Sequence, residues 1–245
     1  KKLHKDIFVD RGSRLTRDTI PNFPESQIIA ECYDMEEEAQ RKINAIYDEM
    51  ETELAKLNKK IKKEKKDSAS ELTAILRARQ KVELVKVPLF VDMIEEALEN
   101  DMSVVVFLNF TETITALSKR LNTQCIVNGV VSDKLRQQNI DDFQADKERI
   151  ILVNIAAGGA GLSLHDLNGK YPRISIISPS YSAVQMRQAT GRVWRDSAKS
   201  KSIQKIVFVA KTVEERVCES VNQKLKNMDL LNDGDLKYEK TQHHS

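Results

Sequence analysis

The second half of the chain alternates short apolar runs with amphipathic stretches, and this alternation limits the possible folds more than any other feature. The apolar runs, rich in valine and isoleucine, lie at residues 103–110, 124–127, 149–154, 173–178 and 202–210. Stretches with helical spacing lie between and after them, at residues 112–121, 132–145, 182–190 and 212–228. Continuous apolar strands that alternate with helices are typical of a parallel sheet covered on both faces. The sequence therefore predicts an α/β fold with a doubly wound parallel sheet.

A long helix is predicted ahead of this region, over residues 34–66. Apolar side chains recur along it every three or four residues, at Ile43, Tyr47, Met50, Leu54, Leu57 and Ile61. This heptad-like spacing is typical of a helix that packs along another helix. A turn at residues 67–70 and a second helix at 71–85 follow. We therefore expect a helical hairpin, or coiled-coil arm, before the sheet.

The tip of the predicted arm carries a dense positive charge. Residues 56–66 contain seven lysines and one glutamate. Such a run could contact nucleic-acid phosphates, or it could be a solvated surface. Both interpretations stay open, and the candidate phosphate contacts are Lys59, Lys60, Lys62 and Lys63.

Composition excludes several classes of protein. Of 245 residues, 40% are hydrophobic and 31% are charged, as in globular proteins. The apolar run at residues 104–108 is far shorter than the roughly 18 residues of a membrane span. Three cysteines lie far apart without a C-x-x-C pair, which argues against a disulfide framework or a zinc site and favours a reducing, intracellular location. The first residues lack the apolar core of a signal peptide. Because the chain starts at Lys1 without a methionine, we expect it to be part of a longer protein.

Parallel sheets bind ligands at the carboxyl ends of their strands, so the loops after Asn109, Asn154 and Ser178 are the most informative. The loop after Asn154 contains three glycines within residues 158–161. Glycine allows the backbone to approach a phosphate closely, although a glycine turn can equally serve tight packing. The patterns G-x-x-x-x-G-K-[ST] and G-x-G-x-x-G are both absent from the sequence.

The stretch QATGRVWRD, residues 188–196, places two arginines three residues apart. If the preceding helix continues, Gln188, Arg192 and Arg195 lie on one helical face. A guanidinium group is always charged, and its planar fork matches phosphate oxygens. The pair therefore predicts a site for phosphoryl charge. An exposed amphipathic helix with surface arginines is the alternative.

Several segments, in order along the chain, resemble motifs of the superfamily-2 helicases. Gln188, Gly191, Arg192 and Arg195 resemble motif VI, ILVNIAAGGAGLSL resembles the Swi/Snf form of motif V, and VVVFLNFTETI resembles motif IV. VNGVVSDKLRQQNIDDF and KTVEERV resemble further segments of this family, and residues 15–33 resemble the bridge that leaves its first motor domain. Trp194 replaces the usual histidine and no I-G-Q follows, so the chain resembles a divergent branch met in phages and large DNA viruses.

The resemblance implies a RecA-like second motor domain at residues 88–232, behind a bridge at 1–33 and an arm at 34–87, with a tail at 233–245. It implies an ATP-dependent DNA helicase or translocase that uses ATP with Mg²⁺ and acts on DNA, double-stranded in the Swi/Snf case. The sequence lacks the Walker A lysine and the D-E-x-[HD] box. A first RecA-like domain of the same polypeptide would supply both, and we expect this chain alone to be inactive.

The resemblance also implies roles for individual residues. Arg192 and Arg195 would be arginine fingers that reach the γ-phosphate of ATP, and Gln188 would support them or sense the nucleotide. Backbone close to the nucleotide would come from Gly159, Gly161 and Gly191. Contacts to the nucleic-acid backbone would come from Asn109, Phe110, Thr111, Ser132, Arg136 and Asn154.

Two other functions remain open. The chain could be a non-catalytic module that recruits a protein partner through the arm seam of Ile43, Met50 and Leu57. A Rossmann-type nucleotide-binding enzyme is a weaker alternative, because the dinucleotide pattern fails at Leu164.

Overall fold

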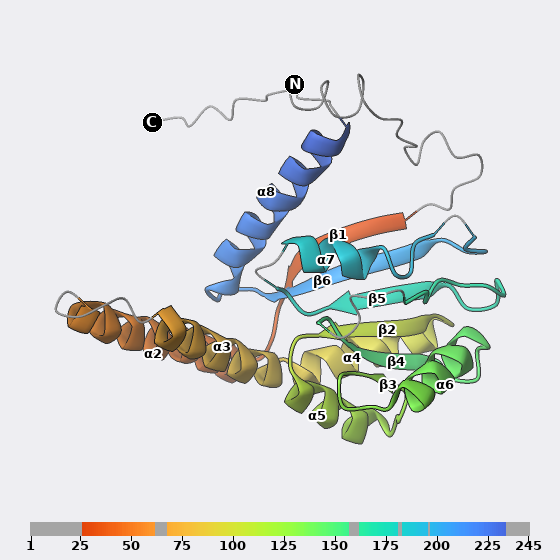
Figure 1. The fold of residues 1–245 in the computed structure, drawn as a ribbon, viewed down its shortest axis with the longest axis horizontal. Coiled ribbons are helices and arrows are strands. Elements are labelled where there is room, and N and C mark those ends of the chain that lie inside the picture. The colour runs from red at the N-terminus through yellow and green to blue at the C-terminus, as the bar shows by residue number, and fades with distance from the viewer. Residues whose placement is uncertain (1–25, 62–67, 157–161, 181–182, 196, 234–245) are drawn as a thin grey trace.

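One parallel sheet forms the centre of the protein (Figure 1). The computed structural model describes residues 26–61, 68–156, 162–180, 183–195 and 197–233. Its six strands are β1 (Ser26–Tyr33), β2 (Ser103–Leu108), β3 (Ile126–Val127), β4 (Ile150–Asn154), β5 (Arg173–Ile177) and β6 (Ser202–Val209). They are ordered β1-β6-β5-β2-β4-β3, and every neighbouring pair is parallel.

Helices cover both faces of this sheet. The five that pack on it are α4 (Val87–Glu99), α5 (Thr111–Leu121), α6 (Asp133–Gln144), α7 (Ala183–Thr190) and α8 (Glu214–Asp233). Residues of α6, α7 and α8 share one core cluster, and residues of α4 and α5 share the other. The predicted doubly wound α/β fold is therefore confirmed.

Strand β2 shows why the apolar runs become central strands. All six of its residues are buried, and β4 and β5 pair with it on either side. Val105 and Phe107 enter the core under α6 to α8, whereas Val104 and Val106 enter the core over α4 and α5. A strand that is buried on both faces has no solvent-facing position to alternate with, so its sequence is apolar from Val104 to Leu108.

Two elements were not expected from the sequence. Residues 26–33, which the sequence analysis assigned to the bridge, form the edge strand β1, which pairs with β6 from Ser26↔Ser202 to Tyr33↔Val209. Helix α4 follows the arm after only Lys86, with a proline in its first turn. Proline is tolerated there because the first N–H groups of a helix have no intrahelical partner.

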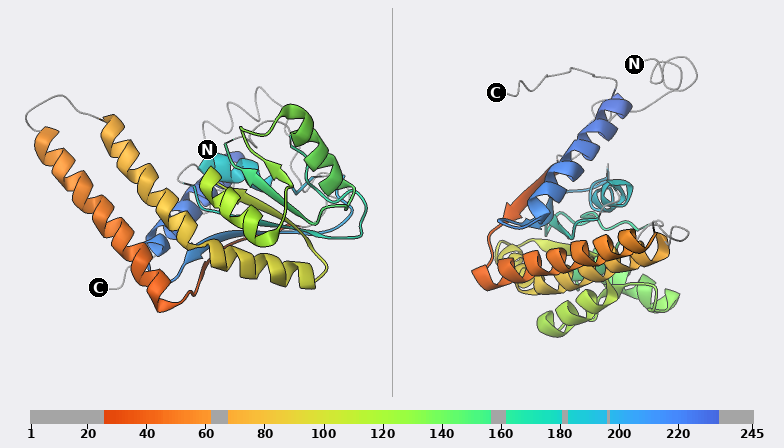
Figure 2. Two further views of the ribbon diagram at one scale, coloured as in Figure 1. Left: turned by 90° about the horizontal axis from the view of Figure 1, so that it is seen from below. Right: turned by 90° about the vertical axis from the view of Figure 1, so that its left-hand side faces the viewer.

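The predicted hairpin arm is present and consists of α2 (Glu37–Ile61) and α3 (Ser68–Val85). The two helices lie side by side and project from the sheet (Figure 2). At the base of the arm, Ile43 and Tyr47 pack with Val82 of α3 and Val209 of β6 in one buried cluster. Since Ile43 has no exposed surface and Met50 is half-buried, this part of the seam holds the hairpin together.

None of the helices in the described part of the chain is both long enough and apolar enough to cross a membrane.

Candidate functional site

The carboxyl edge of the sheet brings together the three loops that the sequence singled out. The side-chain amide of Asn154, at the end of β4, donates to the carbonyl oxygen of Asn109 at 3.2 Å. The side-chain amide of Asn109, after β2, donates to Ser178 Oγ at 3.2 Å and to the carbonyl oxygen of Pro179 at 3.1 Å, both after β5. The loops thus form one hydrogen-bonded layer, in which the Asn109 amide is directed inward.

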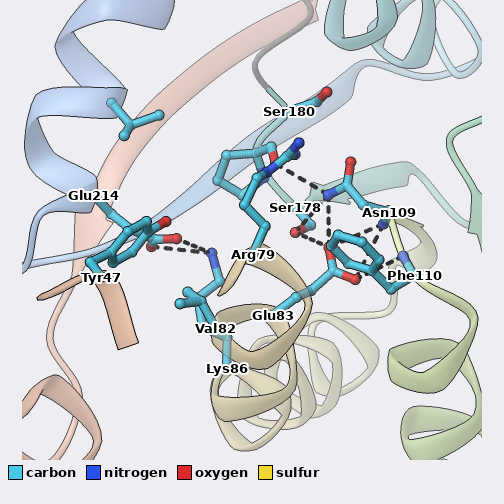
Figure 3. A pocket seen from close by; sticks show the side chains of 12 residues that line it. Tyr47, Arg79, Val82, Glu83, Lys86, Asn109, Phe110, Ser178, Ser180 and Glu214 are labelled. Atoms are coloured by element: carbon cyan, nitrogen blue, oxygen red, sulfur yellow. Dashed lines mark hydrogen bonds and ion pairs between the residues drawn. The ribbon is translucent and has the colours of Figure 1, made fainter. Parts of the chain in front are cut away.

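A buried carboxylate from the arm lies at the centre of this layer. Glu83, on α3, is 2% exposed. It accepts hydrogen bonds from the backbone N–H of Asn109 at 3.0 Å, from the backbone N–H of Phe110 at 3.1 Å and from the Asn109 side chain at 2.7 Å. The hydroxyl of Ser178 donates to it as well (Figure 3). Four donor groups therefore replace the water that a carboxylate loses on burial.

Directly after α3, at the N-cap of α4, a buried lysine makes a second connection. Lys86 is 1% exposed, and its Nζ donates to both carboxylate oxygens of Glu214 on α8, at 3.0 and 3.2 Å (Figure 3). The same Nζ donates to the carbonyl oxygen of Val207 in β6 at 3.2 Å, while Glu214 also accepts from the N–H of Val209 at 3.0 Å. Both charges are thus paired and hydrogen-bonded, as buried charges need to be.

Sequence analysis missed Glu83 and Lys86. A signal was available, because they are the only two charged residues in the otherwise apolar run 82–90. Charged side chains in such a run tend to be buried together with partners. The partners lie 26 to 128 positions away along the chain, so the sequence alone could not identify them.

The N-termini of two helices lie at the same carboxyl edge. Phe110 is the N-cap of α5 and Thr111 its exposed first residue. Ser132 is the N-cap of α6, where its hydroxyl accepts from the N–H of Leu135 at 3.4 Å, and half-buried Arg136 follows one turn later. Helix N-termini carry partial positive charge and N–H groups without intrahelical partners, which suit anions.

The structure corrects the prediction for the two arginines. Helix α7 ends at Thr190, so exposed Gln188 is helical, but Arg192 and Arg195 lie in the turn that follows and not on the same helix. Gly191 begins this turn, and the N–H of Arg192 donates to the carbonyl oxygen of Ala189 at 3.1 Å. Glycine favours such an end because it loses the most conformational freedom in a helix.

This turn is attached to the segment that follows the glycine loop. The N–H of Leu164 donates to the carbonyl oxygen of Arg192 at 2.9 Å, and Arg195 Nη2 donates to the carbonyl oxygen of Leu162 at 3.2 Å. His165 Nε2 and Ser197 Oγ are 2.8 Å apart in a hydrogen bond. The segments that resemble motifs V and VI are thus joined side by side.

Arg192 is affected both by its partial burial and by the charge of Arg195. Burial lowers the pKa of Arg192, and the positive charge of Arg195 lowers it further. Arginine nevertheless stays protonated at any physiological pH. Two positive charges near each other in a half-buried turn are a combination that suits an anion.

Some predicted site residues lie outside the described residues or are only partly described. Gly159, Gly161, Lys62 and Lys63 are outside them. Lys59 and Lys60 belong to the last turn of α2, and their side chains are not described. Their predicted contacts stay predictions.

Within the described ranges, no group of three or more histidine, cysteine, aspartate or glutamate side chains could hold a metal ion. The arginine pair fits the phosphates of ATP but not the metal.

Comparisons with known proteins agree with this geometry. Residues 85–197 match the helicase conserved C-terminal domain. A protein of Acanthamoeba polyphaga mimivirus, named as a candidate ATP-dependent RNA helicase, is 37% identical over 227 residues, which cover 92% of this chain and 41% of that protein. The DNA repair and recombination protein RAD54 of Saccharomyces cerevisiae is 27% identical over 133 residues, which cover 52% of this chain and 14% of that protein.

A solved structure shows the same fold. The C-terminal part of the Fun30 ATPase domain superposes with a TM-score of 0.59 at 15% identity, covering 86% of this chain and 98% of that chain. A parallel sheet flanked by helices on both faces, with its polar loops gathered at the carboxyl edge, thus defines a RecA-like domain. The chain carries the C-terminal RecA-like domain of a superfamily-2, Swi/Snf-like helicase. It spans less than half the length of the two relatives above.

Proposed function

We propose that this chain is the second motor domain of an ATP-dependent translocase that acts on double-stranded DNA inside cells. ATP with Mg²⁺ binds mainly to a first RecA-like domain of the same polypeptide, and this chain completes the site. The observation that carries the proposal is the turn at residues 191–195, where two arginines are held together beside residues 162–164.

In this proposal, Arg192 and Arg195 contact the γ-phosphate as it is transferred to water. Negative charge on the phosphoryl oxygens is then stabilised by two fixed guanidinium groups, and an arginine in this role contributes on the order of 10³ or more in rate. Gln188, exposed on α7 one turn before Arg192, supports the arginines or senses the nucleotide. Gly159, Gly161 and Gly191 let the backbone approach the nucleotide.

Nucleic acid binds along the carboxyl edge of the sheet. Phe110, Thr111, Ser132 and Arg136 sit at or just after the N-termini of α5 and α6, where phosphate charge is favoured. Contacts of this kind are made to phosphates and not to bases. Binding is therefore sensitive to salt and largely independent of the nucleic-acid sequence. Asn109 and Asn154 contribute by fixing the loops, since both side-chain amides donate to neighbouring loop groups.

Duplex DNA is the proposed substrate because the glycine loop has the Swi/Snf form and because RAD54 is named as a DNA repair protein. RNA is a second candidate, since the viral relative is named as an RNA helicase. A non-catalytic module that binds partners through the arm seam has less support, because Ile43 is fully buried within the protein.

The proposal is tested by ATP hydrolysis in the full-length protein with duplex DNA, single-stranded DNA, forked DNA or duplex RNA at low and high salt. We expect the largest stimulation by duplex DNA, weakened as salt rises, and no hydrolysis above background from this chain alone. If only RNA stimulated ATP hydrolysis, RNA would replace DNA as the proposed substrate. Hydrolysis by the isolated chain that is abolished by Arg192→Ala would overturn the shared site.

A further inference from the structure

We propose that Glu83 is a positioning residue for nucleic-acid binding, through which the helical arm sets the loop between β2 and α5. The inference rests on the proposed function, because it assumes that this loop contacts nucleic acid. It assigns the arm a role that does not depend on the lysines at its tip or on a protein partner.

The first argument is the way in which α5 begins. Its N-cap, Phe110, provides no side-chain cap of its own. Instead, the backbone N–H groups of Asn109 and Phe110 both donate to the Glu83 carboxylate, at 3.0 and 3.1 Å. A residue of the arm therefore fixes the direction in which α5 starts. The N–H groups of the next three residues have no intrahelical partner, and they are the groups that a phosphate would meet.

The second argument is that Glu83 joins loops from neighbouring strands. Its carboxylate accepts from Asn109 after β2 and from Ser178 after β5. Arg79, one turn earlier on α3, donates from Nη2 to the carbonyl oxygen of Pro179 at 3.2 Å. Figure 3 shows Arg79, Glu83, Ser178 and Asn109 around one pocket. Loss of the carboxylate would release two loops at once.

The third argument is that the arm has a separate anchor. Lys86, at the junction of α3 and α4, and Glu214 connect the base of the arm to β6 and α8. That anchor is just as buried, but no hydrogen bond connects it to Asn109 or Phe110 in the described residues. Variants of the two anchors can therefore be compared. Such a comparison distinguishes a specific effect on the loop between β2 and α5 from a general loosening of the arm.

The experiment measures the affinity of the full-length protein for duplex DNA by fluorescence anisotropy at one fixed salt concentration. Glu83→Gln keeps the shape of the side chain but turns one acceptor oxygen into an NH₂ donor that faces N–H groups. We expect the dissociation constant to rise about tenfold, the size of effect that one lost hydrogen bond to a charged group produces. The KM for ATP should change less than twofold.

The matched control removes the other anchor as a pair, through Lys86→Met together with Glu214→Gln. We expect its affinity for DNA to stay within about twofold of the wild type, even if its melting temperature falls as far as that of Glu83→Gln. Ser178→Ala, which removes one donor and leaves the carboxylate, should weaken binding about two- to threefold. This milder variant decides the matter if Glu83→Gln does not fold.

The outcomes separate this inference from the proposed function. If the wild-type protein binds no nucleic acid, the proposed function fails and the inference falls with it. If the wild type binds but Glu83→Gln binds equally well, only the inference is overturned. Equal weakening by Glu83→Gln and by the control pair would also overturn it, because the arm would then act through general rigidity.

Discussion

The base of the arm and the arginine turn are both polar and both at least half-buried, but they are built in opposite ways. At the base of the arm, Glu83 faces four donor groups and Lys86 faces a carboxylate. In the turn, Arg192 and Arg195 place like charges together. The first region joins buried charged groups to partners of opposite charge or to hydrogen-bond donors. The second region brings two charges of the same sign together, a composition that suits an anion.

This contrast predicts that the two regions respond differently to mutation. Changes in the arginine turn should reduce catalysis with little effect on folding. Changes at the base of the arm should reduce stability first, because they leave a buried charge without its partner.

The largest expected effect is that of Arg192→Ala on ATP hydrolysis by the full-length protein. We expect kcat to fall on the order of 10³-fold, because the variant loses charge stabilisation that acts only in the transition state. Steady-state hydrolysis with saturating duplex DNA checks this. Arg216→Ala, on the exposed side of α8, is the matched control and should retain wild-type kcat. A similar loss of kcat in both variants would contradict a specific catalytic role for the arginine turn, because any surface arginine would then matter equally.

The next effect is on stability. Lys86→Met leaves Glu214 buried without its cation, so we expect the free energy of unfolding to fall by about 3 kcal/mol. Adding Glu214→Gln should recover much of that loss, since the remaining buried group is then neutral. Urea denaturation of the 245-residue chain measures both variants. If the single and the double variant were equally stable, Lys86 and Glu214 would not form an energetically coupled pair.

A smaller effect is expected for a phosphate contact. Arg136→Ala should weaken binding to duplex DNA about threefold to tenfold and reduce the salt slope by about one, in the same way on unrelated sequences. Lys119→Ala is the control, because Lys119 lies in the last turn of α5, at the opposite end from the carboxyl edge. A change that depended on DNA sequence would indicate base contacts and contradict backbone binding.

The smallest effect concerns the tip of the arm. Reversing the charge of Lys59, Lys60, Lys62 and Lys63 to glutamate should weaken duplex binding about twofold to threefold and lower its salt slope. Salt titration of binding measures both quantities. An unchanged affinity and slope would mean that these lysines only solvate the tip.

The sequence predicted the central strands well because their signal is local. Five apolar runs became β2 to β6, since strands that are buried on both faces are built mostly from apolar residues. Edge strand β1 was missed because SQIIAECY mixes polar and apolar residues, and Ile28 is 44% exposed at the sheet edge. The loops at the carboxyl edge followed from topology once the strands were correct.

The errors at the site arose from interactions that are not local. Helical spacing put Arg192 and Arg195 on α7, but the chain leaves the helix at Gly191 and hydrogen-bonds to Leu162 and Leu164. Glu83 could not be assigned a role from the sequence because its partners belong to other elements. Local patterns therefore predicted the framework, and tertiary contacts determined the site.

The central claim is that Arg192 and Arg195 stabilise the phosphoryl group during transfer in a site shared with another domain. The most direct test compares nucleotide binding by the full-length wild type and the double variant Arg192→Ala, Arg195→Ala, using a non-hydrolysable ATP analogue and ADP with aluminium fluoride, which resembles the transferring phosphoryl group. We expect the double variant to bind the ATP analogue nearly as well as the wild type, but to lose at least about 100-fold in affinity for the transition-state analogue. Equal affinity of the two proteins for ADP with aluminium fluoride would contradict the account.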